Sequence, residues 1–142
     1  MEVRKVRKDD IDAIARLAGE LGYPSTVAEI RQRLESMERN PDHATFVAVE
    51  RGGKVIGWIG LSRVYALESD PRAEITGLIV DSGYRSGGVG RLLVERGEAW
   101  ARELGLNAMG VRSNVIRDRA HQFYLRLGYE VTKSQKVFRK ML

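Results

Sequence analysis

Apolar residues recur every three or four positions in four segments of the chain, and this spacing predicts four amphipathic helices. Thr26 and Glu29 form a capping-box pattern at the start of the second helix, and Pro41 stops its continuation. Each of the other three helices precedes a glycine that can adopt the left-handed backbone of a helix end, namely Gly22, Gly105 and Gly128. The expected helices cover residues 11–21, 27–39, 89–104 and 118–127.

Short runs of β-branched and aromatic residues lie between these segments and predict strands. Residues 51–54, Arg-Gly-Gly-Lys, have the composition of a hairpin turn between two of them. Gly57 and Gly60 lie inside the second strand of this hairpin and indicate a bulge, a close backbone approach or simply a twisted strand. We expect residues 68–71 to form a loop before the next strand. The expected strands cover residues 3–7, 45–49, 55–61, 73–80, 108–112, 129–131 and 136–138.

The order of these elements predicts an α/β (α+β) fold in which helices cover the faces of a mixed sheet. A chain of 142 residues has the common size of one domain, so we expect residues 1–142 to fold as a single domain. No apolar run approaches the roughly 20 residues that a membrane-spanning helix needs. The N-terminus also lacks the apolar core of a secretory signal, so we expect a cytoplasmic protein without a membrane partner.

The composition limits the chemistry that the chain can perform. It has no cysteine, which excludes disulfides, thiolate metal sites and a cysteine acyl-enzyme. Its two histidines, His43 and His121, lie far apart in the sequence, and we expect no metal centre. The formal net charge of +5 favours an anionic partner. Positive and negative residues are interleaved throughout, however, which is typical of a solvated surface rather than a nucleic-acid site.

A glycine-rich segment at residues 85–90, Arg-Ser-Gly-Gly-Val-Gly, joins a predicted apolar strand to a predicted helix. Glycine allows backbone amides to converge, and the helix that follows adds the positive end of its dipole, so this turn suits a phosphate. A P-loop is excluded because Val89 stands where that motif requires lysine. A dinucleotide-binding fingerprint is excluded because no third glycine follows Gly90 at the required spacing.

The remaining pattern, Arg-x-x-Gly-x-Gly, resembles the coenzyme A turn of the GCN5-related N-acetyltransferase (GNAT) superfamily. Residues 119–129, Arg-Ala-His-Gln-Phe-Tyr-Leu-Arg-Leu-Gly-Tyr, resemble the later signature of the same family. The two segments have the family's order and separation, and the resemblance covers the whole chain. It implies a mixed, mostly antiparallel sheet of about seven strands and acetyl-CoA as cosubstrate. Within the superfamily, the chain is most similar to aminoalkylphosphonate and aminoglycoside acetyltransferases.

The resemblance also implies which residues bind coenzyme A. Backbone groups of the strand before the turn would contact the pantetheine arm, and amides of the turn would contact the pyrophosphate. Many family members have asparagine at the position of Arg117, and Asn114 lies nearby, so either residue could meet the cofactor. The implied residues are Leu78, Ile79, Val80, Arg85, Ser86, Gly87, Gly88, Val89, Gly90 and Arg91, with Asn114 or Arg117.

Direct transfer from the thioester to an amine in a ternary complex is the simplest reaction, because no cysteine is available. The resemblance places Tyr124 near the sulfur as general acid, and a phenol with a pKa of about 10 stays protonated at neutral pH. Without the resemblance, Tyr124 would be interpreted as a core residue. Glu74 is the candidate base, and a solvent-facing or ion-paired role is an equal alternative for it. His121 is expected to be structural.

The expected acceptor is a primary amine of a small molecule. Its recognition would lie in residues 23–25, in residues 64–70 and in the last two strands, and Glu68 and Asp70 could attract a cationic acceptor. The alternative is a non-catalytic module that senses coenzyme A or binds nucleic acid. The final strands would also offer an exposed edge through which a homodimer can form.

Overall fold

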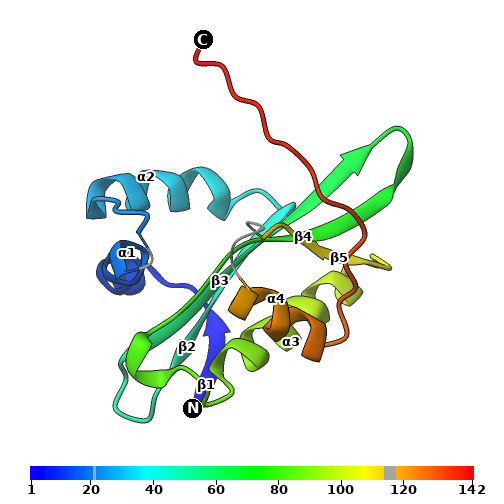
Figure 1. Ribbon diagram of the computed structural model, residues 1–142. Coiled ribbons are helices and arrows are strands. Elements are labelled where there is room, and N and C mark those ends of the chain that lie inside the picture. The colour runs from blue at the N-terminus through cyan, green and yellow to red at the C-terminus, as the bar shows by residue number, and fades with distance from the viewer. Residues whose placement is uncertain (21, 114–117) are drawn as a thin grey trace. The chain divides into compact units, whose positions relative to one another are not determined.

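A computed structural model covers residues 1–142 and describes residues 1–20, 22–113 and 118–142 (Figure 1). The chain divides into two compact units, Met1–Val111 and Arg112–Leu142. The first unit contains a five-stranded sheet and three α-helices, and the second contains the helix α4 and the residues that follow it. The α/β fold class predicted from the order of the elements is therefore confirmed.

The sheet has the strand order β1-β2-β3-β4-β5, so strands that are consecutive in the chain are neighbours in the sheet. The first four strands are antiparallel to one another, and β5 lies parallel to β4. The sheet is mixed and mostly antiparallel, as expected, but the described residues form five strands rather than about seven. The strands span Glu2–Lys5 (β1), His43–Val49 (β2), Val55–Ala66 (β3), Ser69–Val80 (β4) and Met109–Val111 (β5).

Local capping signals set the helix boundaries. Thr26 Oγ1 accepts a hydrogen bond from the Glu29 N–H at 3.0 Å, and Glu29 Oε1 accepts one from the Thr26 N–H at 2.9 Å. The predicted capping box is therefore confirmed. The α-helices span Ile11–Glu20 (α1), Val27–Glu38 (α2), Val89–Glu103 (α3) and Asp118–Arg126 (α4), and 3₁₀ turns span Lys8–Asp10 and Ser82–Tyr84.

Helices α1 and α2 cover one face of the sheet and α3 covers the other (Figure 1). On the first face, Leu17 of α1 belongs to a buried cluster with Val47 and Ile79. On the opposite face, a Cβ on Gly57 would lie 2.9 Å from the Ile79 carbonyl oxygen and 3.1 Å from Leu93 Cδ1 of α3. The close approach that was one prediction for Gly57 is confirmed, and it allows α3 to pack closely on the sheet.

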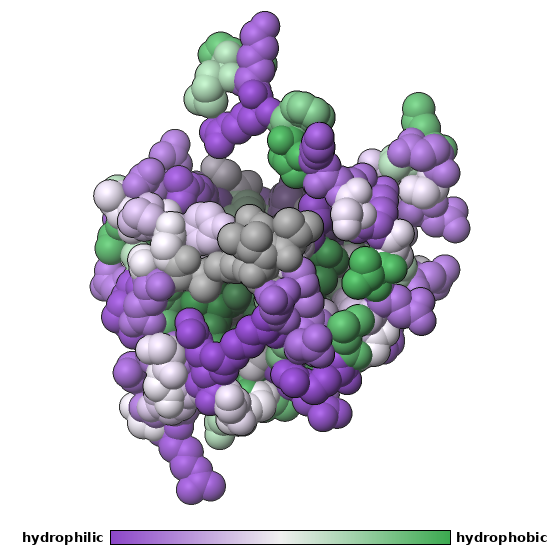
Figure 2. Space-filling model, viewed as in Figure 1, coloured by the Kyte–Doolittle hydropathy of each residue, from purple (hydrophilic) through white to green (hydrophobic). Residues whose placement is uncertain are grey.

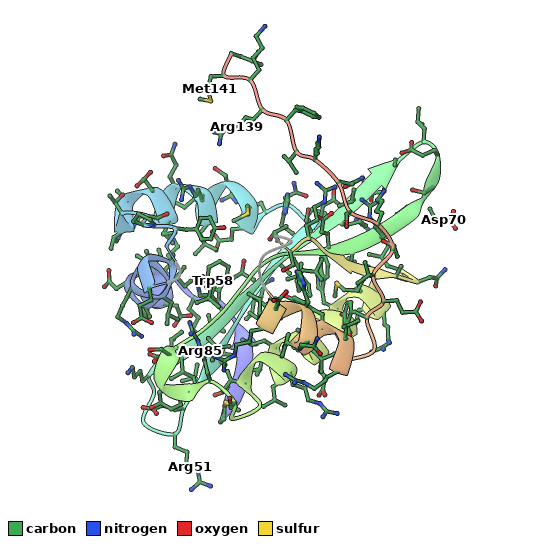
Figure 3. All side chains as sticks on the ribbon, viewed as in Figure 1. Arg51, Trp58, Asp70, Arg85, Arg139 and Met141 are labelled. Carbon is green, nitrogen blue, oxygen red and sulfur yellow. The ribbon has the colours of Figure 1, made fainter. Side chains whose placement is uncertain are left out.

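The prediction of a loop at residues 68–71 is wrong. Strands β3 and β4 continue outward as a long hairpin, with Ala66 paired to Ser69 across a tight turn. Pro71 is tolerated inside β4 because the ladder is irregular between Val64 and Ala66 on the facing strand. Asp70 consequently lies near the tip of the hairpin (Figure 3).

The prediction of two strands at residues 129–131 and 136–138 is also wrong. The structure contains no strand after α4 in the described chain, and residues 130–142 are exposed along their whole length. The sequence signal for these strands was local, whereas a strand needs a neighbouring backbone to which it can hydrogen bond. The missing strands account for the difference between five strands and the seven expected.

Hydrophilic residues cover much of the face shown in Figure 2, with apolar residues scattered among them. Within residues 1–20, 22–113 and 118–142, no helix has the length and apolar character needed to cross a membrane. The same residues contain no group of three or more potential metal ligands.

Candidate functional site

Asp81 anchors the start of the glycine-rich turn. Its carboxylate accepts a hydrogen bond from the Gly83 N–H at 2.9 Å and one from Arg16 Nη1 of α1 at 3.1 Å. Its own N–H donates to the Ile56 carbonyl of β3 at 2.8 Å. The Gly83 N–H and the Arg16 guanidinium, with Lys54 nearby at 3.7 Å, hold the pKa of this buried carboxyl below its ordinary value. The turn is thus tied to both α1 and the sheet.

The turn itself has a left-handed backbone at two positions. Ser86 has φ +69° and Gly88 has φ +82°, and Gly88 is also the N-cap of α3. The first helical hydrogen bond runs from the Leu92 N–H to the Gly88 carbonyl at 3.1 Å, so the N–H groups before Leu92 have no acceptor inside the helix. Residues 85–88 are exposed. An exposed helix N-terminus of this kind can bind an anion such as phosphate through its backbone amides and the helix dipole.

The predicted basic residues of the turn differ in their surroundings. The Arg91 Nε donates to Glu95 Oε1 at 2.8 Å, one turn along α3, so its charge is already partly balanced. Arg85 is exposed at the turn (Figure 3), and no ion pair of its side chain is recorded among the described residues. Tyr84 donates a short hydrogen bond to Glu50, which raises the pKa of the Tyr84 hydroxyl. Arg85 is therefore the cation best placed to add charge to an anion at the turn.

One side of β4 is open next to the turn. Strand β5 pairs with β4 only from Ala73 to Ile75. Because the Asp81 N–H points to β3 and backbone groups alternate along a strand, the N–H and C=O groups of Leu78 and Val80 point away from β3. In the described chain, no strand pairs with that side of β4 beyond Ile75. Of the three residues predicted to offer backbone groups, Ile79 is the one whose groups point to β3.

A β-bulge lies where β4 and β5 stop pairing. Gly60 pairs with Gly77 and Leu61 pairs with Ile75, so Thr76 is an extra residue in β4. This confirms the bulge that was one prediction for Gly60. A bulge increases the local twist of its strand, which helps β4 to diverge from β5.

The sequence analysis missed Trp58, which lies on the sheet face covered by α1 and α2 (Figure 3). A Cβ on Gly77 would lie 3.0 Å from two atoms of its ring, and a Cβ on Gly60 would lie 3.5 Å from one of them. Part of the ring therefore lies over Gly77 and next to Gly60, beside the bulge. Its buried Nε1–H has no hydrogen-bond partner among the described residues. Glycines in two neighbouring predicted strands, together with a tryptophan, were the sequence signal that could have indicated this contact.

Glu74, the candidate base, lies on the same face of the sheet as Trp58. Glu74 pairs with Ser62 of β3. Ser62 lies four residues after Trp58, and side chains alternate between the two faces along a strand, so Ser62, Trp58 and Glu74 share one face. The Glu74 side chain is 17% exposed, and its Oε2 lies 3.9 Å from Arg72 Nη2. The structure is thus compatible with both interpretations of Glu74, as a base and as an ion-pair partner.

Tyr124, the candidate acid, lies in α4 of the second unit. Its ring meets the Phe123 and Tyr129 rings edge to face, with centroids 5.1 and 5.8 Å apart. The Tyr129 N–H also donates to the Tyr124 carbonyl at 3.0 Å, and Gly128 between them has φ +93°. These contacts fix the end of α4 around a half-buried Tyr124. Asn114 and Arg117 lie outside the described residues.

Two cavities of the first unit lie away from the turn. One of about 470 Å³ is lined by β1, the end of α2 and α3, and one of about 320 Å³ by the β3–β4 hairpin and residues 104–107. Neither is lined by Glu74, Trp58 or residues 85–90. The turn and the open side of β4 remain the candidate site, because an extended ligand can bind along a backbone edge without an enclosed cavity.

Sequence comparison identifies the family of the chain. The family model described as "Acetyltransferase (GNAT) family" matches residues 11–129. The aminoglycoside N(6')-acetyltransferase type 1 of Stenotrophomonas maltophilia is 26% identical over 99% of this chain and 93% of its own. The amino-acid acetyltransferase of Pseudomonas putida is 32% identical over 77% of this chain, which spans only 24% of that longer protein.

Comparison with solved structures gives the same fold. The aminoglycoside N-acetyltransferase AAC(6')-Iy in complex with CoA has a TM-score of 0.88 and 21% identity, over 99% of this chain and 95% of that one. The same enzyme in complex with a bisubstrate analogue of CoA and an acetylated neamine has a TM-score of 0.87. At this identity the likeness establishes the fold alone.

Proposed function

The chain belongs to the acetyltransferase (GNAT) family of N-acetyltransferase enzymes, and from this premise we propose that it moves an acetyl group from acetyl-CoA to a primary amine of a small molecule. The observation that carries the proposal is the glycine-rich turn at residues 85–90, which has left-handed backbone at Ser86 and Gly88, is exposed over residues 85–88 and leads into the N-terminus of α3. The aminoglycoside acetyltransferase relative supports the class of acceptor. The amine itself has no signature in the sequence.

Coenzyme A would bind along the edge of β4. The amides of residues 86–90 and the Arg85 guanidinium would hold the pyrophosphate, because an anion at a helix N-terminus gains from both the amides and the helix dipole. The amide groups of the pantetheine arm would pair with the outward backbone groups of Leu78 and Val80, as an added strand would. The bulge at Thr76 supports this position, since it opens β4 beside the turn.

Acetyl-CoA supplies an activated thioester when it is bound. The reaction forms a nitrogen–carbon bond, breaks the carbon–sulfur bond, and moves one proton from the amine and one to the sulfur. Glu74 would take the amine proton, directly or through water, and the Tyr124 hydroxyl would hold the proton that the departing thiolate receives. No covalent enzyme intermediate is needed, in keeping with a chain that has no cysteine.

The acceptor would lie on the sheet face that carries Glu74 and Trp58. The flat ring of Trp58 offers a surface on which an aminated ring can stack or a cation can rest. Tyr23 is exposed in the α1–α2 connection, which the sequence analysis associated with the acceptor.

One observation favours the second candidate, a coenzyme A sensor without turnover. The Glu74 carboxylate is within 4 Å of a cation, at 3.9 Å from Arg72, and an ion pair reduces its availability as a base. Both functions predict that coenzyme A binds in calorimetry, and only the enzyme predicts turnover, so calorimetry combined with a turnover assay separates them.

The test follows thiol release from acetyl-CoA over a panel of primary amines, for the wild type, Tyr124→Phe and Tyr129→Phe. Tyr129 is the matched control, because its ring contacts the Tyr124 ring and only a hydroxyl is lost. General acid catalysis contributes roughly 10²–10⁴-fold, so Tyr124→Phe should lose about that much kcat while its coenzyme A affinity is unchanged. Equal turnover of wild type and Tyr124→Phe would remove Tyr124 as the acid. Coenzyme A binding with no turnover on any amine would favour the sensor.

A further inference from the structure

The cavity of about 470 Å³ in the first unit lies where β2 extends beyond β1. The pairing of the two strands ends with Lys5 opposite Phe46, and one further hydrogen bond runs from the Val6 N–H to the Thr45 carbonyl at 3.0 Å. Residues 43–44 of β2 therefore have no strand partner on that side in the described chain. The end of α2 and the second half of α3 border the resulting gap, and all residues that line it belong to the first unit.

The floor of this cavity is apolar. Ala44, Phe46 and Trp100 line it, and each is at most 9% exposed. Lys5 pairs with Phe46 across the two strands, and paired residues lie on the same face of a sheet, so Lys5 lies beside the floor. The cavity thus combines a buried apolar floor with a charged rim. Its volume falls within the roughly 300–1,000 Å³ that is usual for small-molecule sites.

Arg96 of α3 is held against this floor by its contact with an aromatic ring. Its guanidinium carbon lies 4.2 Å from the centre of the Phe46 ring, and its side chain is 34% exposed. Arg96 Nη1 lies 3.5 Å from Glu103 Oε1, but the guanidinium donates no hydrogen bond to a described residue. Arg96 therefore presents unused N–H donors beside the cavity. Because stacking fixes the plane of the guanidinium, these donors are oriented for a planar or tetrahedral oxyanion.

The distribution of charge around the cavity favours an anion in its depth. Arg4, the other half-buried cation of the lining, donates to Asp10 Oδ2 at 2.8 Å, so its charge is already balanced. The remaining charged residues of the lining are exposed: Lys5, Glu38, Arg39 and Glu103. The least exposed charge of the lining without a hydrogen bond is therefore the positive charge of Arg96.

We propose that this cavity binds a small organic oxyanion, a carboxylate or phosphate monoester that carries an apolar group. The oxyanion accepts hydrogen bonds from the Arg96 guanidinium, and Lys5 adds a second positive charge. The apolar group packs on the floor beside Trp100. Arg96 lies seven residues after Val89, about 10 Å along α3 from the helix N-terminus, so this site is separate from the glycine-rich turn. The proposal does not depend on the proposed acetyl transfer.

NMR titration of the wild type tests the site directly. The chain has two tryptophans, which give two indole N–H signals, and Trp58→Phe shows which signal belongs to Trp100. The probes are phenyl phosphate, benzoate and benzylamine, which share an aromatic ring and differ in charge. We expect at least one of the two oxyanions to shift the Trp100 signal with half-saturation below about 5 mM, and benzylamine to leave it unshifted. A Trp100 signal that neither oxyanion half-saturates at about 5 mM, or that benzylamine shifts equally, would overturn the proposal.

Two arginines of α3 provide the matched comparison, because Arg96 lines the cavity and the exposed Arg102 does not. We expect the half-saturating concentration of the tighter oxyanion to rise at least about tenfold in Arg96→Gln and less than about twofold in Arg102→Gln. Lys5→Glu reverses an exposed charge at the rim, so it tests the site even where Arg96→Gln impairs folding, and we expect a rise of at least about threefold. Equal affinity of folded Arg96→Gln and Arg102→Gln, or unchanged affinity in Lys5→Glu, would contradict the assignment.

Discussion

The six-membered ring of Trp58 lies directly over Gly77, where a Cβ would come within 3.0 Å of both Cη2 and Cζ3. The ring occupies the place that a side chain would take, beside the bulge at which β4 leaves β5. The contact joins β3 to β4 across 19 positions of the sequence. The shape of the proposed acceptor face therefore depends on a residue without a side chain.

We expect Gly77→Ala to displace Trp58 and to lower the free energy of unfolding by about 1–3 kcal/mol. Gly60→Ala should cost less, because the nearest atom is the hydroxyl of Thr76, an exposed side chain that can rotate. Urea denaturation measures both. Gly19→Ala is the control: its Cβ would meet nothing within 4 Å, and helix propensity predicts a gain of up to about 1 kcal/mol. A Gly77→Ala variant with the wild-type midpoint would contradict the contact.

Asp81 should make the stability of the first unit depend on pH. Its pKa in the folded state lies below the ordinary value of 3.8, because the Gly83 N–H and Arg16 stabilise the carboxylate. The stabilisation is therefore complete above about pH 4 and is lost as the pH falls through the lower, folded-state pKa. Thermal melts from pH 7 to pH 2 measure this dependence, and Asp81→Asn should weaken it. An unchanged pH dependence in Asp81→Asn would show that other carboxyls cause the acid sensitivity.

Asp10 should contribute in the same direction. Burial alone would raise the pKa of this carboxyl, but hydrogen bonds from the Arg4 guanidinium, at 2.8 Å, and from the Arg7 N–H lower it overall. Its stabilisation is likewise lost below about pH 4. The melts of Asp81→Asn should for this reason keep part of the wild-type pH dependence.

Gly88 and Gly53 form a matched pair for testing the turn. Both have positive φ, at +82° and +90°, and a Cβ on either would meet nothing within 4 Å, so alanine adds only backbone strain. We expect both alanine variants to lose about 1–2 kcal/mol of stability. Only Gly88→Ala should weaken coenzyme A binding, by about tenfold or more, because it redirects the amides at the start of α3. Calorimetric titration with coenzyme A measures this, and equal affinity of the two variants would place the cofactor elsewhere.

The turn and the capped helices could be predicted because their signals lie within a few residues. The Thr26–Glu29 box and the glycine turn each need only local geometry. The family resemblance rested on the glycine turn together with residues 119–129, and the fold class on the order of the predicted elements. The Asp81–Arg16 contact joins residues 65 positions apart, and no periodicity indicates it. The overlap of Trp58 with Gly77 depends in the same way on the register of β3 and β4. Neither register nor such pairs are fixed by local propensity.

Residues 129–131 and 136–138 show the opposite limit of local prediction. They have the composition of strands, but the structure contains no strand there in the described chain. Propensity describes how well a residue suits a pleated surface, whereas a strand forms only where a neighbouring backbone pairs with it. Local composition alone therefore predicted two strands wrongly.

Arg85 and Arg51 test the charge at the turn. Both are exposed arginines, and Arg51 lies at the tip of the β2–β3 hairpin (Figure 3). We expect Arg85→Ala to weaken coenzyme A binding about tenfold, because a charge-assisted hydrogen bond to phosphate is worth roughly 1.5–3 kcal/mol. Arg51→Ala should change the affinity less than about twofold. The difference should shrink at high salt, and an equal loss in both variants would indicate only long-range attraction.

Glu74 and Arg72 decide between the two interpretations of the candidate base. Glu74→Gln should lower kcat by about 100-fold or more if the carboxylate accepts the amine proton, with coenzyme A affinity unchanged. Arg72→Gln removes the same 3.9 Å contact from the other side, and should lower stability by at most about 1 kcal/mol while kcat changes less than about threefold. Steady-state kinetics and urea denaturation of both variants provide the comparison. If both lose the same stability and turn over at the wild-type rate, Glu74 is an ion-pair partner, and the base must be sought elsewhere on that face of the sheet.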